Sequence, residues 1–106
     1  MLYRQGDVLI AAIEKIPAGL KPVPKDAGRT ILAYGEVTGH AHAVEGDVEF
    51  LAADVAEMQD RFLRVLSEAR VVHEEHATIT LPPGLYEVRR QREYTSADMP
   101  PVQVAD

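Results

Sequence analysis

The sequence predicts a mostly β fold, a small single-domain antiparallel barrel or sandwich over residues 1–106. Three observations favour this class. Short apolar or β-branched runs recur along the chain, prolines and glycines separate them, and only residues 54–68 carry the period of a short helix. With 106 residues, of which 46% are hydrophobic, the chain can bury a core without disulfides.

The first half of the chain contains three candidate strand regions. The apolar run DVLIAAI, residues 7–13, is typical of a buried strand, and residues 14–29 are rich in proline and glycine, which predicts a surface loop. Residues 30–37 are β-like, and Gly35 within them indicates a bulge or a close approach of two backbones. Further along, strand-like pieces flank residues 45–47, whose Glu-Gly-Asp sequence predicts a turn.

Residues 54–69 admit two interpretations. Apolar side chains recur there at helical spacing, and Asp54 is a suitable N-cap, which favours a helix. The alternative is two strands joined by a tight turn at residues 67–68. Alternation over residues 61–66 is imperfect, but since the rest of the chain favours a sheet, we expect strands.

The C-terminal part of the sequence predicts β-structure more clearly. Residues 78–81 are β-branched, residues 82–84 (Pro-Pro-Gly) predict a sharp turn, and residues 85–94 alternate as a strand. The tail, residues 96–106, is expected to lie on the surface or to cover an edge strand. The alternation places Tyr86, Val88, Arg90, Arg92 and Tyr94 on one face, with Glu87, Arg89, Gln91 and Glu93 on the other.

Charge and composition restrict the classes of function. A net charge of −6 disfavours general nucleic-acid binding, which requires a basic face. The longest apolar run is too short to span a bilayer and the N-terminus lacks a signal-peptide pattern, so we expect a cytoplasmic protein without a membrane partner. The absence of cysteine excludes disulfides and thiolate metal sites.

All four histidines of the chain lie in two pairs, and the first pair is His40 and His42. On a strand, residues at positions i and i+2 point to the same face, close enough to bind one ion. Gly39 frees the backbone just before the pair. Glu45 follows at a distance that a turn would bring into the same coordination shell.

The second pair is His73 and His76, which flank two glutamates. At positions i and i+3 these histidines face opposite sides of an ideal strand but share a face on a helical turn. The β-like segment that follows favours a strand end with a bulge, where one histidine turns inward. The spacing also differs from the H-E-x-x-H of zinc proteases, which disfavours that reaction class.

Three interpretations of the histidine clusters are open. In the first, His40, His42 and either His73 or His76 bind a divalent ion, which without cysteine would be zinc, nickel, manganese or iron. In the second, the imidazoles are structural and hydrogen-bond to neighbouring carboxylates and backbone. In the third, a His–Glu pair acts as a pH-sensitive contact or a general base. The oxygen ligand or base would be Glu45 or Glu75.

The phrases RQGDVLI, GEVTGHAHAVEG and VHEEHATITLPPGLYEVRRQREY resemble an uncharacterised family of short bacterial proteins. This resemblance covers most of the chain and implies a self-contained family, without an activity to carry over.

The chain is also similar in part to cupins, small β-barrels whose metal ligands come from a G…H-x-H…E motif and a later P-x-G-x-x-H motif. Gly35, His40, His42 and Glu45 match the first motif, with two residues instead of three or four between the last histidine and the glutamate. The sequence PPGLYE matches the second motif up to Glu87, which stands where the family has its last histidine ligand.

The sequence thus predicts a small soluble β protein that binds a divalent metal through clustered histidines. The alternative is a non-enzymatic protein-interaction module with structural or pH-responsive histidines, whose partner would bind an alternating charged strand and an acidic surface. Exposed edge strands in so small a domain are also compatible with a homodimer.

Overall fold

The structure, a computed structural model, describes residues 1–35 and 39–91 together with the backbone of residues 103–105. It confirms the mostly β class, since these residues form nine strands and no α-helix. In particular, they contain no helix of the length and apolarity needed to cross a membrane. The strands are β1 (Leu2–Gln5), β2 (Val8–Ile13), β3 (Lys21–Pro22), β4 (Thr30–Tyr34), β5 (Ala41–Asp54), β6 (Gln59–Val72), β7 (Ile79–Leu81), β8 (Gly84–Arg90) and β9 (Gln103–Ala105).

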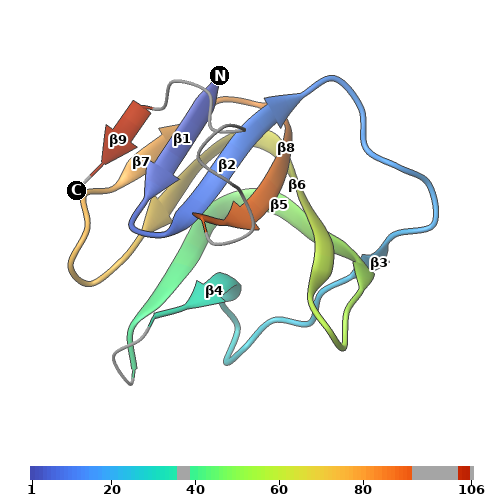
Figure 1. The fold of residues 1–106 in the computed structure, drawn as a ribbon, viewed down its shortest axis with the longest axis horizontal. Helices are drawn as coiled ribbons and strands as arrows, with labels where there is room; N and C mark the ends of the chain where they lie inside the picture. Colours follow the sequence, from blue (N-terminus) through green and yellow to red (C-terminus); the bar gives the residue numbers. More distant parts are fainter. Residues whose placement is uncertain (36–38, 92–102, 106) are drawn as a thin grey trace.

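The two longest strands, β5 and β6, form a central antiparallel hairpin that crosses the molecule (Figure 1). One end of this hairpin carries β4 beside β5 and β7 beside β6. From the other end the sheet continues from β6 through β8, β2 and β1 to β9, with β3 on the outer side of β5. All of these pairings are antiparallel except that of β1 with β9. The described strands therefore form a branched sheet that does not close into a barrel.

A large bulge separates the two ends of the central hairpin. Gly46 pairs with Ala69 and Val48 with Val65, so one residue of β5 faces three residues of β6, Leu66 to Glu68. A bulge bends its strand and increases the local twist. The two ends of the hairpin can therefore serve different branches of the sheet.

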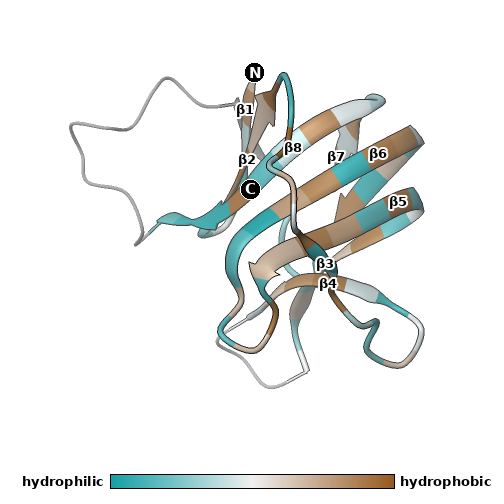
Figure 2. Cartoon of the chain, turned by 90° about the vertical axis from the view of Figure 1, so that its right-hand side faces the viewer, coloured by the Kyte–Doolittle hydropathy of each residue, from teal (hydrophilic) through white to brown (hydrophobic). Residues whose placement is uncertain are grey.

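One hydrophobic core draws on both branches. Fully buried aliphatic side chains come from strands of the β4–β7 end and of the β8–β2 end alike, and Figure 2 shows the hydrophobic bands alternating with hydrophilic ones along β5 and β6. Such alternation is expected where one face of a sheet is buried. The largest of these side chains are Ile10 in β2, Leu32 in β4, Leu63 in β6, Leu81 in β7 and Val88 in β8.

The ambiguous segment 54–69 is strand rather than helix. The turn between β5 and β6 lies at residues 55–58, and β6 then runs without interruption through residues 67–68, where we predicted a tight turn. The bulge takes the place of that turn. Alternation failed as a signal because Arg61, Phe62 and Leu63 are all buried, so that both faces of the strand are covered there.

Other predictions are corrected in detail. The predicted turn at residues 45–47 is wrong, because β5 continues through it and only the bulge marks the place. β1 was not expected at all. The strand predicted over residues 85–94 ends as β8 at Arg90, and residues 92–94 lie outside the described residues. Of the tail, residues 103–105 pair with the edge strand β1, as one of the two alternatives expected.

Candidate metal centre

The two histidine pairs, more than thirty residues apart in sequence, meet at one cavity of about 250 Å³. His40 precedes β5 and His42 lies within it, whereas the second pair follows the end of β6. Because β5 and β6 are antiparallel neighbours, the start of one lies beside the end of the other. The cavity is lined by Asp7, Gly35, His40, His42, His73, Glu75, His76 and Arg90.

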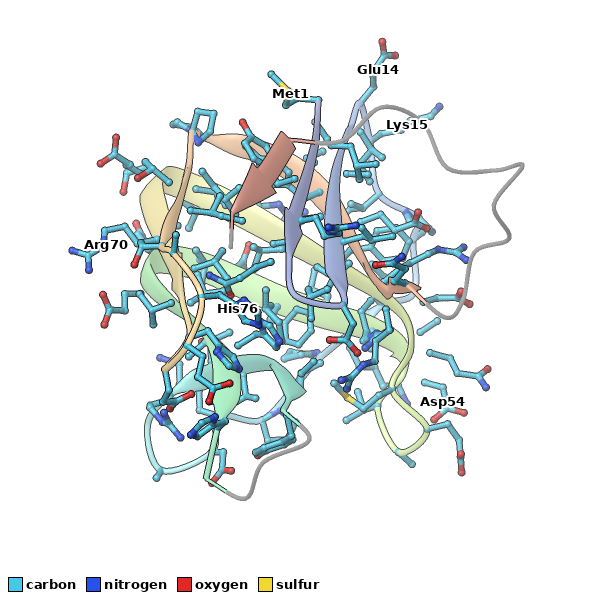
Figure 3. The ribbon with its side chains drawn as sticks, turned by 60° about the vertical axis from the view of Figure 1, so that its left-hand side comes forward. Met1, Glu14, Lys15, Asp54, Arg70 and His76 are labelled. Carbon is cyan, nitrogen blue, oxygen red and sulfur yellow. The ribbon has the colours of Figure 1, made fainter. Side chains whose placement is uncertain are left out.

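The four imidazole rings form one contiguous group. The ring of His73 is central, with its centroid 4.4 Å from that of His42, 4.6 Å from His76 and 5.7 Å from His40. His42 and His76 are nearly parallel, with centroids 6.0 Å apart. Figure 3 shows His76 directed into the molecule, in contrast to Arg70, which extends outward. Both histidines of the second pair thus turn inward, where we had expected only one.

Two glycines lie directly against this group. An added Cβ at Gly35 would lie 3.1 Å from the Cβ of His40 and 3.3 Å from Nε2 of His73, which confirms the predicted close approach. Gly6, in the two-residue turn between β1 and β2, has a φ of +58°, and a Cβ there would lie 2.8 Å from Nε2 of His76. At position 6 the turn can therefore approach the rings only without a side chain.

The hydrogen bonds of Gln5 fix the tautomer of His42. The side-chain amide of Gln5 donates to the carbonyls of Val71 (3.0 Å) and Ala77 (2.9 Å), so its Oε1 is the atom that faces Nδ1 of His42 at 2.9 Å. An amide oxygen only accepts, and Nδ1 must therefore carry the proton. The neutral ring consequently presents the lone pair of Nε2 on its other side.

The surroundings keep His42 neutral at physiological pH. Burial lowers the pKa of His42 to about 4, and the nearby His73, His76 and Arg90 act in the same direction, while Asp7 opposes them. The side chain is 2% exposed. Burial likewise lowers the pKa of His73, with the neighbouring His76 as the next cause. Neutral imidazoles are the form in which histidine binds a metal.

An ion pair between Asp7 and Arg90 closes the cavity on the side of the β1–β2 turn. Nε and Nη2 of Arg90 donate to Oδ2 of Asp7 at 3.0 and 2.8 Å. Burial alone would raise the pKa of Asp7, but the hydrogen bonds and charge of Arg90 outweigh it and hold that pKa below its ordinary value. The second oxygen, Oδ1, lies 3.8 Å from Nε2 of His42, too far for a hydrogen bond.

The loop that follows β6 is held by two hydrogen bonds from the backbone. The amide of Glu75 donates to Nδ1 of His73 (3.0 Å), which places the proton of that ring on Nε2. The amide of Ala41 donates to Oε1 of Glu74 (2.9 Å), and this bond is the main cause of the lowered pKa of Glu74. Glu74 is therefore a carboxylate tied to the start of β5.

Potential ligand atoms converge at His40, His73 and Glu74, where one atom from each lies within 4.8 Å of the other two. Nδ1 of His40 is a buried nitrogen without a hydrogen-bond partner among the described residues. Its nearest carboxylate oxygen is Oε2 of Glu75 at 3.9 Å. His42 is outside this group of three but contacts it through the ring of His73.

Two of the residues expected near the site lie elsewhere. Glu45 is exposed on β5 and forms an ion pair with Arg70 at 3.3 Å, because the strand continues where the sequence predicted a turn. Glu87, at the position of the last cupin ligand, pairs with Arg89 and lines a different pocket. The cupin-like set of ligands is therefore not brought together here.

Sequence reasoning also missed Gln5, Asp7, Glu74 and Arg90 as members of the site. A Gly-Asp pair after Gln5 was a usable signal for the turn that brings Asp7 to the rings. Arg90 was predicted to share a face with the buried Tyr86 and Val88, and this position leads it into the cavity. Nothing in the sequence indicated that Gln5 pairs with His42.

The fold and site define a small, branched antiparallel β-sheet protein with a cavity built from histidines and carboxylates. Residues 4–91 match the family described as a domain of unknown function (DUF8820), and the chain belongs to that family. No curated protein and no solved structure matches the chain.

Proposed function

We propose that the histidine cavity binds one divalent transition-metal ion. The ligands are nitrogen atoms of His40 and His73 and a carboxylate oxygen of Glu74, with His42 as an adjacent third imidazole. The convergence of the first three residues, within 4.8 Å of one another, is the observation that carries this proposal. A tetrahedral ion with bonds of about 2.0–2.2 Å would draw the ligand atoms to roughly 3.3–3.6 Å, a contraction of at most about 1.5 Å.

The unsatisfied nitrogen of His40 supports a ligand at this place. A buried polar atom without a partner costs about 1–3 kcal/mol, and a metal ion would satisfy it. His42 also supports metal binding, because its Nδ1 is hydrogen-bonded to Gln5. Metal-binding histidines are generally oriented by such a hydrogen bond at the second ring nitrogen. With only imidazole and carboxylate donors, the ion would be zinc, nickel, manganese or iron.

Binding through His73 has a specific structural consequence. Nδ1 of this ring accepts the amide of Glu75, so coordination by Nε2 requires Nδ1 to take up the proton. The hydrogen bond from Glu75 must then open, at a cost of about 1 kcal/mol. Amide exchange of Glu75, followed by NMR, should therefore accelerate when zinc is added. Zinc binding with an unchanged Glu75 amide would exclude His73 as a ligand.

Metal titration of untagged, chelator-treated protein tests the proposal as a whole. Isothermal titration with zinc, nickel, manganese and iron(II) should show that the protein binds close to one equivalent of at least one ion. The variant His40→Ala should no longer bind that ion. Glu74→Gln should weaken binding roughly tenfold or more. Glu45→Gln is the matched control, because that carboxylate is exposed and paired with Arg70 outside the cavity, so it should leave affinity unchanged.

A structural role for the histidines is the second candidate, and the Gln5 network favours it for one residue. Through Gln5, His42 is tied to the backbone of Val71 and Ala77, so it fastens β5 to β6 and its following loop. If no ion binds and none raises the thermal stability, the histidines are structural and the metal proposal fails.

A further inference from the structure

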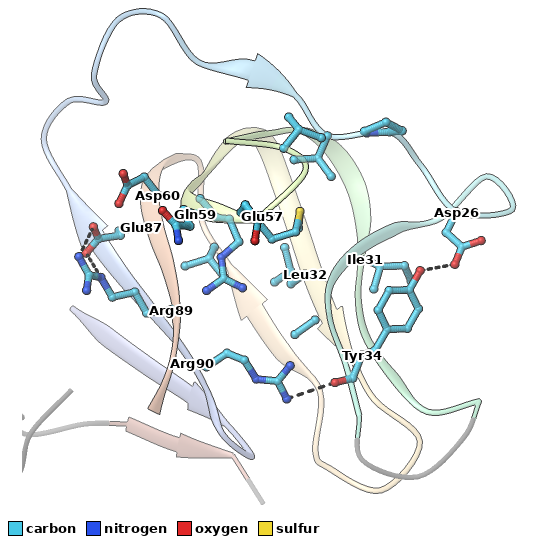
Figure 4. A pocket seen from close by; sticks show the side chains of 17 residues that line it. Asp26, Ile31, Leu32, Tyr34, Glu57, Gln59, Asp60, Glu87, Arg89 and Arg90 are labelled. Atoms are coloured by element: carbon cyan, nitrogen blue, oxygen red, sulfur yellow. Dashed lines mark hydrogen bonds and ion pairs between the residues drawn. The ribbon is translucent and has the colours of Figure 1, made fainter. Parts of the chain in front are cut away.

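A second and larger pocket, of about 690 Å³, lies beside the histidine cavity, and Arg90 lines both. Its volume falls within the usual range for small-molecule sites. Figure 4 shows Arg90 reaching toward Tyr34, whose backbone carbonyl accepts a hydrogen bond from Nη2 at 3.2 Å. The apolar part of the wall includes Val23, Ile31, Leu32, Ala33, Met58 and Val88.

Arg61 occupies an inward position that the strand pattern reserves for a hydrophobic residue. Along β6, Arg61 shares the alternating face of Leu63 and Val65, both of which belong to the core. Arg61 is only 7% exposed and lines the pocket. Burial of a guanidinium is costly, and departures from the hydrophobic pattern concentrate at functional sites. This residue is also the reason why residues 61–66 did not alternate cleanly in the sequence.

A second inward arginine lies on the neighbouring strand. Arg61 pairs with Val88 of β8, and Arg90 is two residues further along the same face. Such diagonal neighbours are about 7–8 Å apart at the backbone, within reach of two long side chains. The guanidinium group has five N–H donors in a planar fork, so Arg90 can serve Asp7 and a further anion together.

We propose that this pocket binds a small organic carboxylate with an apolar body, whose carboxylate is held by Arg61 with Arg90 beside it. The aliphatic wall receives the body of the ligand, and the arginine fork matches the geometry of a carboxylate. Three of the four acidic residues of the lining, Asp26, Glu57 and Asp60, are exposed, where solvent screens their charges, and the fourth, Glu87, is partly buried and forms an ion pair with Arg89. Arg61, in contrast, is buried.

Octanoate, with octanamide as its neutral counterpart, tests the proposal on chelator-treated protein. Titration followed by ¹H–¹⁵N NMR up to roughly 10 mM should give saturable binding of octanoate, at least about tenfold tighter than that of octanamide, since one charge-assisted hydrogen bond has that effect. Perturbed amides should cluster at residues 31–33, 58–61 and 87–89. Absence of saturable binding, or equal binding of the two compounds, would overturn the proposal.

Two arginine variants in β6 test which side chain binds the carboxylate of octanoate. Arg61→Met should weaken octanoate binding at least about tenfold and leave octanamide unchanged. Arg64→Met is the matched control on the same strand, because Arg64 pairs with Glu49 on the other face. Equal octanoate binding by Arg61→Met and the native protein would reject Arg61, and should that variant not fold, the amide map decides alone. Since the chelator is present throughout, this result is independent of metal binding.

Discussion

The histidine cavity has two walls of different construction. The strand wall consists of Asp7, from the turn after β1, and His42, from β5, with Gln5 of β1 buried behind His42. The loop wall is the segment 73–76, which lies outside regular secondary structure. His42 is 2% exposed and Gln5 is fully buried, whereas Glu74 and Glu75 of the loop wall are exposed. One wall is thus part of the core, and the other can rearrange.

This difference suggests a division of tasks. The strand wall presents a nitrogen in a fixed tautomer, because Gln5 is held by His42 of β5, by Val71 of β6 and by Ala77 of the loop that follows β6. The loop wall supplies donors whose positions can adjust to an ion at the cost of one backbone hydrogen bond. Changes in the strand wall should therefore affect stability, and changes in the loop wall should affect metal affinity.

The largest expected effect is that of His42→Ala on stability. Removing this ring empties a buried volume and leaves Oε1 of Gln5 without its donor, so the free energy of unfolding should fall by about 3–4 kcal/mol. His76→Ala, in the loop wall, should cost about 1 kcal/mol or less. Urea unfolding of both variants with a chelator present measures the difference. Equal losses would mean that the two walls are not distinct.

A smaller effect is expected from acidification. The pKa of His42 is about 4 in the native protein and near its ordinary value of 6.5 in the unfolded chain. The unfolded state therefore binds more protons between these values, and stability falls as the pH decreases through this window. The total decrease in the free energy of unfolding approaches about 3 kcal/mol near pH 4. Asp7, whose pKa is lowered from 3.8, contributes only at still lower pH.

Urea unfolding across this pH range distinguishes the two walls. The free energy of unfolding of the native protein should decrease by up to about 1.4 kcal/mol per pH unit. In His42→Ala the larger part of that slope should be gone, with His73, whose pKa is also lowered, as a source of the remainder, while His76→Ala should retain most of it. If His42→Ala keeps the pH dependence of the native protein's free energy of unfolding, groups other than His42 cause that dependence.

The smallest effect concerns the contact between the walls at Gly6. Gly6→Ala places a Cβ at positive φ and against His76, and should cost about 1–2 kcal/mol. Gly28→Ala is a matched control, since Gly28 has a φ of +80° but open space around its Cβ position. Most of the excess cost at Gly6 should disappear when His76 is also replaced by alanine, since the remaining contact, with Cε1 of His42, is longer at 3.3 Å. If Gly6→Ala and Gly28→Ala lower the free energy of unfolding equally, both with His76 present and with His76 replaced, the His76 ring moves aside freely.

The strands of the C-terminal half show which structure the local sequence pattern could predict. Residues 84–90 alternate because one face of β8 packs into the core, and the Pro-Pro-Gly turn precedes them as predicted. Residues 54–69 were ambiguous because β6 is covered on both faces at residues 61–63 and carries Arg61 inward. The period of a strand is visible in a sequence only where one face remains polar.

The sequence by itself determined the mostly β class, the strand character of the main apolar runs and the two histidine pairs. Only the tertiary structure decided which residues accompany these histidines. Asp7 and Arg90 reach the cavity through a turn and a strand register, and Glu45 misses it because β5 continues past a bulge. The physical reason is that sheet partners are distant in sequence, and a shift of one residue reverses the face of every side chain.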